Sequence, residues 1–533
     1  MNRRIMKQNI IKKGLYTVAM VSAMSFTACT GDLNVTPIDP NLDTPEKVLN
    51  NTEAYNQLLA KCYSALSVSS PDGDSGEPDI KSIDGGFGQY LRALINLQEL
   101  PTDEAVMNWN DQTIKDLHGL CWSTNDVFVT AAYGRMFYQI SLCNEVIRRI
   151  DAASNASDAK MQQYRAEARA LRALTYYHII DLFGNVPFVD EHSQVGGANP
   201  ERITRPELFE WLVKDLEETA EQLPDNPEKY RAGKGLAYML LAKLYLNAKV
   251  YTGTANYAKC AEYCQKVLGL GYTLASQSDY YKLFCADNDK QLGVGHEIIF
   301  SVYQDHLNTK AYGGTTYLIN AACGGTADYA ADFGLGGSGW SGLRLTPEFV
   351  NKFESDDLRG GNLFFETKEG AGKLITDIGE FEAGGYSYKK FNNLKADGTL
   401  LTDANSFADT DFPVFRLSDV YLMLAECEVV GGVSCDGIAK FNAIRTRAGV
   451  NPIANPTASD IIDERARELA WECHRRSDLV RFNLLTTDTY IWAYKGMNSN
   501  AGSAHAVNDK YNLYPIPSSD IMANSNLKQN DGY

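Results

Sequence analysis

Apolar residues recur at helical spacing along most of the first half of the chain. One segment places apolar side chains four, three, four and three residues apart, at Met136, Ile140, Cys143, Ile147 and Ile150. This spacing puts the five side chains on one face of an α-helix. Similar patterns predict helices from about residue 44 to 270, and one of them, 162–183, stops before Gly184 and Pro187.

Local signals support two more of these helices. Thr204 and Glu207 form a capping-box pattern ahead of an apolar helical face. The segment 233–248 is apolar nearly all round, so we expect it to be deeply buried. Small residues at the expected crossings, Ala237, Ala242, Ala258 and Ala261, favour closely paired helices of the tetratricopeptide kind.

The pattern changes between about 290 and 412, where glycines cluster and short β-prone runs such as EIIFSVY replace helical periods. Loop-rich stretches of this length usually carry function. Helical patterns return at FRLSDVYLMLAECEVV, GIAKFNAIRTRAGV and 461–482. The sequence therefore predicts a mainly α protein with a helical scaffold at about 44–280, a loop-rich insertion with short strands at about 290–412, and C-terminal helices and a tail at about 413–533.

The first 28 residues read as an export signal. They contain five basic residues and no acid, followed by a short apolar run that ends in Thr27 and Ala28. Cys29 then follows, which is typical of lipoproteins whose mature chain begins with an acylated cysteine. We expect residues 1–28 to be removed, a single domain to span 29–533, and lipid on Cys29 to anchor the chain to a membrane.

Charge and cysteine content restrict the partners. The net charge is −17, and the export signal carries only positive charge, so the remaining chain is strongly acidic. Such a surface disfavours nucleic acid and anionic lipid. The eleven cysteines contain no CxxC pair and no Cys/His cluster with metal spacing, and the sequence leaves their disulfide state open.

Catalytic signatures are absent from the sequence. The stretch from Gly334 to Gly339 matches GxGxxG formally, but no helical pattern follows it, which argues against a dinucleotide site. The sequence lacks a P-loop, HExxH and GxSxG, and its seven histidines lie apart. Carboxylates are plentiful, so the sequence does not exclude a catalytic pair of acids of the kind that glycosidases use. No acid, however, stands in a sequence setting that distinguishes it from a solvated surface residue.

The tryptophans point to a ligand. Trp211 and Trp471 lie within helical periods and are expected in the core, whereas Trp109, Tyr312 and Trp340 lie in polar or glycine-rich segments. A sugar ring presents an apolar C–H face to an aromatic ring and hydroxyls to polar groups around it. These three rings are therefore candidates for carbohydrate binding; the alternative is that each packs on its own loop.

The sequence resembles the SusD-like (SusD/RagB) family of outer-membrane nutrient-binding lipoproteins. The resemblance is carried by Cys29 with LNVTPIDP, by AEARALRALTYYHIIDLFGNVPF, FRLSDVYLMLAECEVVGG and RARELAWECHRRSDLVRF, and by the ending YPIPSSDIMANSNLKQNDGY. It implies a tetratricopeptide-like scaffold, no enzymatic activity, and a SusC-like TonB-dependent transporter as partner at the cell surface. The arginines of RRSDLVRF look like fold signatures held in ion pairs, and we do not assign them to the ligand.

The resemblance is strongest to members that bind starch. It implies that Trp109, Tyr312 and Trp340 form an aromatic arc for an α-glucan, flanked by Asp84, Arg92 and Gln112. It departs from the pattern in three places: the alignment around 84–92 is less secure, Gln112 is a changed residue type, and the loop holding Trp340 is shorter. These departures bear on linkage and chain-length preference.

A structural calcium ion is a further expectation. The resemblance places hard oxygen ligands at Asp289, Asp409 and Asp411, and calcium takes six to eight oxygens. Ordinary Asx turns explain the same residues equally well. No cofactor is otherwise required.

The sequence thus predicts a non-catalytic, surface-exposed lipoprotein of the outer membrane that binds starch or malto-oligosaccharides. Within the family, a fructan or a branched glucan is the alternative ligand. A surface glycosidase and a helical protein-interaction scaffold are the alternatives from other classes.

Overall fold

The computed structural model describes residues 45–324, 327–366, 386–401, 406–497 and 502–533. It is mainly helical, with 48% helix and 5% strand, which confirms the predicted fold class. Residues Met1–Ala54 and Tyr55–Tyr533 separate into two units, and all that follows on packing concerns the second. Cys29 and the predicted export signal lie outside the described residues.

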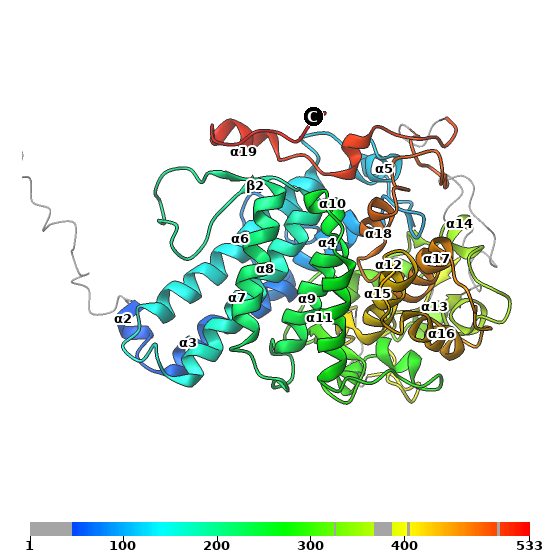
Figure 1. Cartoon of the computed structure of the whole chain (residues 1–533), viewed down its shortest axis with the longest axis horizontal. Coiled ribbons are helices and arrows are strands. Elements are labelled where there is room, and N and C mark those ends of the chain that lie inside the picture. The colour runs from blue at the N-terminus through cyan, green and yellow to red at the C-terminus, as the bar shows by residue number, and fades with distance from the viewer. Residues whose placement is uncertain (1–44, 325–326, 367–385, 402–405, 498–501) are drawn as a thin grey trace, which may run out of the picture. The chain divides into compact units, whose positions relative to one another are not determined.

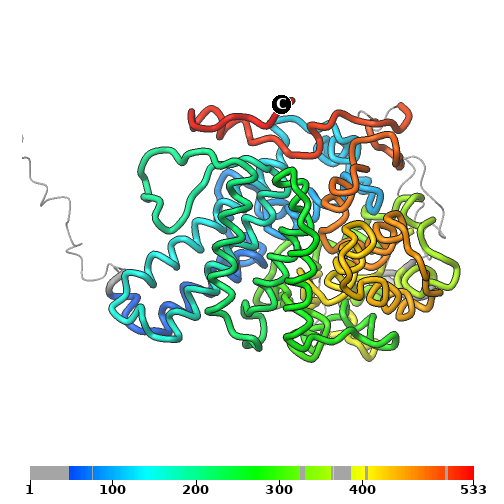
Figure 2. The backbone as a smooth tube through the Cα atoms, in the orientation of Figure 1, coloured from blue at the N-terminus to red at the C-terminus, as the bar shows by residue number. Residues whose placement is uncertain are grey.

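Antiparallel helix pairs form the scaffold (Figures 1 and 2). Along the chain, α6 packs on α7, α7 on α8, α8 on α9, and α9 on α11, so each helix buries its apolar stripe against its sequence neighbour. This matches the predicted tetratricopeptide-like stacking. The bounds are α6 (Val127–Asp151), α7 (Ala159–Leu182), α8 (Arg205–Ala220), α9 (Lys234–Leu246), α10 (Ala248–Thr252) and α11 (Tyr257–Gly269).

Two local predictions are confirmed in this stack. Thr204 caps α8 with a complete capping box to Glu207. Helix α9 is buried on nearly every side, as its apolar sequence requires.

The C-terminal helices extend the stack, because α15 packs on α11 and α16 on α15. Their bounds are α15 (Leu417–Val429), α16 (Gly437–Arg447), α17 (Ala458–Leu469), α18 (Arg475–Arg481) and α19 (Ser518–Ala523). The helix predicted over 461–482 is wrong as a single element. The chain leaves helical geometry at Trp471 and Cys473, which have positive φ angles of 59° and 64°.

Tertiary partners explain this break. The Lys390 ammonium group donates to the carbonyls of Glu468 and Ala470, which are thereby taken up at the end of α17. The Cys473 amide donates to the carboxylate of Glu99 at 2.6 Å. Both partners are distant in sequence, so local periodicity carries no sign of them.

The remaining α-helices of the second unit are α4 (Tyr90–Glu99), α5 (Gln112–Gly119), α12 (Gly314–Ala322), α13 (Ala327–Asp332), α14 (Pro347–Val350) and most of α3 (Thr52–Ser67). Helix α2 (Pro45–Val48) belongs to the first unit. Helices α12 to α14 fall inside the segment predicted to be loop-rich. No described helix has the length and apolar character needed to cross a membrane.

Short antiparallel strand pairs tie distant segments together. Strand β1 (Val106–Met107) pairs with β5 (Leu343–Arg344), β2 (Val186–Pro187) with β3 (Arg202–Ile203), β4 (Ile298–Val302) with β8 (Phe412–Arg416), and β6 (Phe365–Glu366) with β7 (Ser387–Tyr388). The β1–β5 and β4–β8 pairs join the insertion to the scaffold and to the C-terminal helices.

A buried ionic network, defined as Arg359, Arg416, Arg447, Glu297, Glu464 and Glu468, fixes β4 and β8 onto α16 and α17. Arg416 and Arg447 both bind Glu297, at 2.9 and 2.7 Å. Burial opposes ionisation of both acids, but the guanidinium groups of Arg447, Arg416 and Arg359 hold the pKa of Glu468 well below its usual range. Arg359 and Arg467 lower the pKa of Glu464 to about 2. The ion pairs expected at helical spacing for the arginines of RRSDLVRF are confirmed for Arg481, which binds Asp478 on the same helix as well as Glu426. Arg475 is paired too, but with Asp103, which is distant in sequence.

Candidate functional site

The three predicted rings lie together. We call Trp109, Tyr312 and Trp340 the aromatic platform. The ring centroids of Trp109 and Trp340 are 6.5 Å apart, and those of Tyr312 and Trp340 are 5.9 Å apart. Trp340 is therefore the central ring. Tyr312 is 40% exposed, and the two indoles are half-buried, so each ring has an accessible part.

Strand pairing brings two of these rings together. Trp109 follows β1 and Trp340 precedes β5, and Val106 pairs with Arg344 across the two strands. The pairing continues past the strands, because the Asn108 amide donates to the Gly342 carbonyl at 3.1 Å. The pairing of two short strands thus brings together two rings that lie more than two hundred residues apart in the sequence.

Trp109 is locked against the loop that carries Trp340. Its indole Nε1 donates to the Ser341 carbonyl at 2.9 Å. Gly342 has φ 126°, and a Cβ atom there would lie 2.4 Å from the same Nε1. Only glycine permits this approach, since both the backbone angle and the space exclude a side chain.

Helix α12 positions Tyr312 and Trp340. Tyr312 stands two residues ahead of its first residue, and the Trp340 amide donates to the carbonyl of Asn320 in its last turn at 2.7 Å. The Tyr312 hydroxyl donates to Asp74 at 3.4 Å.

Arg92 on α4 supports the platform from behind. Its Nη1 donates to the Tyr312 carbonyl at 2.9 Å, and its guanidinium lies 5.6 Å from the Trp109 ring centre and 4.6 Å from that of Tyr317. Burial lowers the pKa of Arg92, and Tyr317 and Asp84 oppose that shift. Arg92 therefore contacts two members of the platform and holds them in fixed positions.

Asp84 lies beside this group. Its Oδ1 accepts hydrogen bonds from the amides of Gly86 and Phe87, at 2.8 and 3.1 Å. A Cβ atom on Gly86 would lie 3.0 Å from Asp84 Oδ1 and 3.6 Å from Arg92 Nη1, so carboxylate and guanidinium border the same small space. Gln112 is exposed at the start of α5, where its amide donates to Asp116 at 2.7 Å.

Two aromatic neighbours were missed by the sequence reasoning. Buried Tyr317 packs 6.1 Å from Trp109, and half-buried Phe407 lies 5.6 Å from Tyr312. Tyr317 falls on the same helix that follows Tyr312, and Phe407 stands in the polar run SFADTD, which resembles the settings of the other rings. The second signal could have identified Phe407.

A protein of known function resembles this chain over nearly its whole length. The chain is 34% identical to the starch-binding protein SusD of Bacteroides thetaiotaomicron over 99% of its own length and 100% of that protein. The chain belongs to the SusD family. Residues 365–533 match the model described as "SusD family", and residues 89–246 match one described as "Starch-binding associating with outer membrane".

More distant relatives share the fold. A SusD-like protein of Bacteroides ovatus is 25% identical over 67% of the chain and 66% of that protein. A SusD superfamily protein from Parabacteroides distasonis superimposes with a TM-score of 0.69 at 24% identity, covering 90% of this chain and 99% of that one. Surface glycan-binding protein A of B. thetaiotaomicron, solved with laminarihexaose, gives 0.68 at 20% identity over the same shares. The SusD family consists of non-catalytic carbohydrate-binding proteins.

The acids expected to bind calcium separate into two groups in this SusD-family fold. Buried Asp411 accepts the Gln304 amide at 2.9 Å, and its pKa is raised to about 7, first by burial and further by the charge of Asp289. Asp289 itself pairs with Lys229. Asp409 instead contacts His306 at 2.7 Å, and the two lie in a cluster with Asp305 whose ligand atoms are all within 4.8 Å of one another.

The two tryptophans that were expected in the core differ in how deeply they are buried. Trp471 is 1% exposed, so that prediction is confirmed. Trp211 is half-buried, because it lies at the surface of α8, where its ring packs edge-on against Tyr176 and Phe188. The prediction of a core position is wrong for Trp211. The helical period shows which face of the helix carries the side chain, but not how completely other parts of the chain cover that face.

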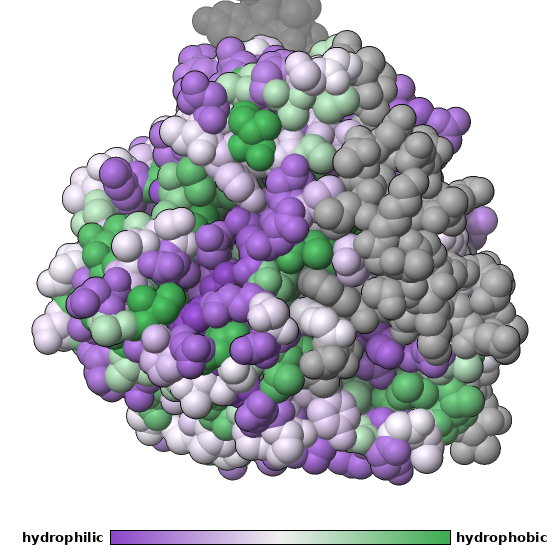
Figure 3. Space-filling model, turned by 90° about the vertical axis from the view of Figure 1, so that its right-hand side faces the viewer, coloured by the Kyte–Doolittle hydropathy of each residue, from purple (hydrophilic) through white to green (hydrophobic). Residues whose placement is uncertain are grey.

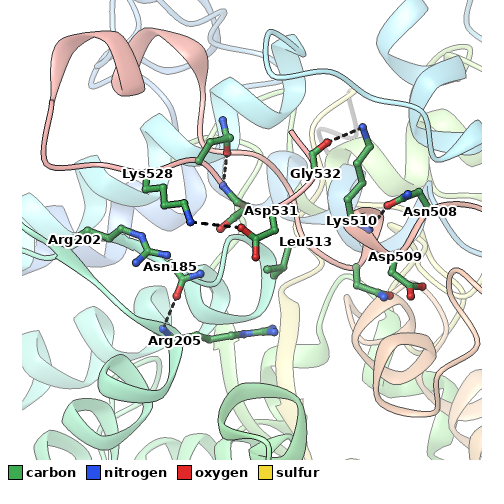
Figure 4. Close-up of a pocket in the computed structure, with 13 residues that line it drawn as sticks. Asn185, Arg202, Arg205, Asn508, Asp509, Lys510, Leu513, Lys528, Asp531 and Gly532 are labelled. Atoms are coloured by element: carbon green, nitrogen blue, oxygen red, sulfur yellow. Dashed lines mark hydrogen bonds and ion pairs between the residues drawn. The ribbon is translucent and has the colours of Figure 1, made fainter.

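A polar cavity of about 540 Å³ lies apart from the platform, near the C-terminal segment (Figure 4). Lys528 pairs with Asp531, Lys510 donates to the Gly532 carbonyl, and Arg205 donates to the carbonyls of Ile180 and Asp181. These cations are engaged by the protein's own groups. The cavity contains none of the predicted site residues.

Proposed function

We propose that this SusD-family chain binds starch and malto-oligosaccharides on the aromatic platform and delivers them to a SusC-like TonB-dependent transporter. The observation that carries the proposal is the continuous contact of the three rings, which the sequence places in three separate segments. The 34% identical relative named as a starch-binding protein supports the same ligand class.

The ring arrangement suits a curved chain. Successive rings are tilted by 46° and 54°, so the platform is not flat, and we infer that its faces follow an arc. An α-1,4-linked glucan curves in solution, and it can lay the C–H faces of successive glucose units on such an arc. A flat chain would contact one or two rings only.

Polar groups beside the arc would fix the sugar hydroxyls. Asp84 offers a carboxylate acceptor, Arg92 a guanidinium donor, and Gln112 an amide. Asp84 and Gln112 are exposed, so their hydrogen bonds with a ligand exchange with water and contribute orientation more than affinity.

A structural calcium ion held by Asp289, Asp409 and Asp411 is part of the proposal. Its support is that Asp411 Oδ2 is buried without a hydrogen-bond partner in the described part of the chain, and such an oxygen is stabilised by a cation. Lys229 would turn to solvent to free Asp289. The ion would pin the start of the insertion to β8.

We further propose that lipid on Cys29 holds the protein at the outer surface of the outer membrane. The family model that matches residues 89–246 is described by association with that membrane, which supports the location. The transporter partner rests on the family resemblance.

An affinity gel panel tests the ligand. Purified protein is run through gels containing amylopectin, laminarin or inulin, and reducing ends are assayed after incubation with each. We expect retardation by amylopectin alone and no new reducing ends. Stronger retardation by laminarin or inulin would replace the α-glucan with another glycan, and release of reducing ends would show a hydrolase.

A further inference from the structure

Phe407 lies beside the aromatic platform and extends its series of rings. Its ring centroid is 5.6 Å from that of Tyr312, and the two rings are tilted by 44°. Within the platform, Trp340 lies 6.5 Å from Trp109 and 5.9 Å from Tyr312, with tilts of 46° and 54°. Tyr312 therefore contacts Phe407 at nearly the spacing and tilt that it has with Trp340.

Helix α12 holds the backbone around Phe407 as well as the platform. The side-chain amide of Asn320 donates to the Ser406 carbonyl at 2.7 Å. The Ala408 amide donates to the Thr316 hydroxyl at 3.0 Å. Phe407 stands between these two attachments, so its position is fixed by the same helix that places two rings of the platform.

One buried residue connects this segment to Trp340. Asn320 is fully buried, and its backbone carbonyl accepts the Trp340 amide at 2.7 Å while its side chain holds Ser406. The loop of Trp340 and the segment of Phe407 are thus tied to a single side chain. Rings held in this way are already in position before a ligand arrives, which lowers the entropy lost on binding.

The Phe407 ring is only partly covered by the protein. In the segment 406–410, Ala408 is 2% exposed and Thr410 is fully buried, whereas Phe407 is half-buried. The segment therefore turns two small side chains inward and leaves its one large apolar side chain partly accessible. Burial of apolar area favours the reverse arrangement, so the ring gains free energy when a ligand covers it.

A sugar chain is a better match for this ring than a protein partner. On the side of the molecule that carries α13 and α14, the hydrophobic residues in view form small patches separated by hydrophilic ones (Figure 3). Protein partners usually require a larger continuous apolar area. Phe407 itself offers a flat apolar face and no hydroxyl, so it can stack on the C–H face of a sugar without selecting any of the sugar's hydroxyls.

We propose that Phe407 forms a fourth subsite of the glycan-binding surface, next to Tyr312, and that this subsite sets a preference for longer glucan chains. The inference rests on the proposed function, because it takes the platform to bind an α-glucan. Since stacking on Phe407 involves no hydroxyl, the added subsite contributes to chain-length preference rather than to linkage preference.

The experiment titrates the intact protein calorimetrically with maltotriose and with maltoheptaose. Maltotriose is short enough for the platform alone, whereas maltoheptaose extends beyond Tyr312. Phe407→Ala should weaken maltoheptaose roughly five- to twentyfold, the effect of losing part of one ring face, and leave maltotriose nearly unchanged. Phe407→Tyr keeps the ring and should bind both ligands like the wild type.

Phe137→Ala is the matched control. Phe137 is also half-buried and also packs against a tyrosine, Tyr133, with centroids 4.7 Å apart, but it lies on α6, which carries no platform residue. This variant should leave both titrations unchanged, and melting curves check that every variant is folded. The short ligand separates direct contact from an indirect effect, because displacement of Tyr312 would weaken maltotriose as well.

The fourth subsite is overturned if the wild type binds both ligands and Phe407→Ala either binds maltoheptaose like the wild type or weakens the two ligands equally. If the wild type binds neither ligand, the proposed function fails, and the subsite fails with it. The wild-type titrations thus distinguish the two failures.

Discussion

Replacing Trp340 with alanine is the sharpest test of the platform. Trp340 is the ring that contacts both others, so its loss divides the arc into two separate rings. A tryptophan buries about 150–250 Å² when fully covered. Stacking on one face covers roughly half of that, which at about 25 cal/mol per Å² amounts to about 2–3 kcal/mol. We therefore expect α-glucan binding to weaken roughly 30- to 150-fold.

Calorimetric titration with maltoheptaose and with α-cyclodextrin measures this loss. The cyclic glucan should bind the wild type at least as well as the linear one, because its curvature is already fixed and less conformational entropy is lost. Trp340→Ala should weaken both ligands while the melting temperature changes little, since the ring is half-buried in a surface loop.

Trp211→Ala is the matched control. Trp211 is also half-buried, but it packs on Tyr176 and Phe188 and lies under Arg172, whose guanidinium is 5.0 Å from its ring centre. This variant should lower the melting temperature and leave the titrations unchanged. If Trp340→Ala binds α-glucans like the wild type, or if neither glucan binds the wild type, the platform assignment is refuted.

Three further predictions concern the anchor, the metal and the buried charges. Cys29→Ala should release the protein from the membrane fraction with an unchanged melting curve; retention in a strain without the transporter would contradict the anchor. A chelator should lower the melting temperature more at pH 8 than at pH 6, because calcium needs the Asp411 carboxylate and its pKa of about 7 lets protons compete at the lower pH. An unchanged curve at both pH values, with no bound metal by elemental analysis, would exclude the ion. Glu468→Gln should destabilise the protein by about 3–5 kcal/mol at pH 7, because Arg416 and Arg447 lose a buried partner. Since the folded pKa of Glu468 is depressed, this stabilisation is fully present above the unfolded pKa of about 4 and is lost as the pH falls through the folded value, so the calorimetric difference between wild type and variant should shrink as the pH falls below about 4. A constant difference across that range would contradict the assignment.

Periodicity identified the scaffold because its helices are long and bury one face against a neighbour in sequence. Where the partner is distant in sequence, the same reasoning failed. The break between α17 and α18 depends on Lys390 and Glu99, and neither leaves a trace in the apolar pattern of 461–482. Helix α12 was missed for a related reason: it is short, buried on all sides, and flanked by glycines that read as loop.

The platform rings were identifiable because each stands where an apolar side chain has no local reason to be. Their contact was not derivable from spacing, since it depends on the β1–β5 pair and on the amide of Trp340 reaching Asn320. The depth of Trp211 could not be derived for the same reason, because it depends on which residues surround the ring in the fold. Residue type and local setting indicate what a side chain can do, but only the fold decides which side chains meet.

The fold also explains why the platform needs a well-anchored insertion. Two of its rings are placed by α12, which follows β4 in the chain, and β4 is held to the C-terminal helices by the pair with β8 and by Glu297, the residue just before the strand. A buried network of this kind contributes little net stability, because desolvation offsets much of its attraction. It does make alternative placements of β4 costly, since any shift would leave buried charged groups without their ion-pair partners. Ligand binding to rings that are already in position loses less conformational entropy than binding to mobile loops. We therefore attribute the charge density at β4 and β8 to positioning, which suits the proposed recognition of an uncharged, flexible glycan by shape.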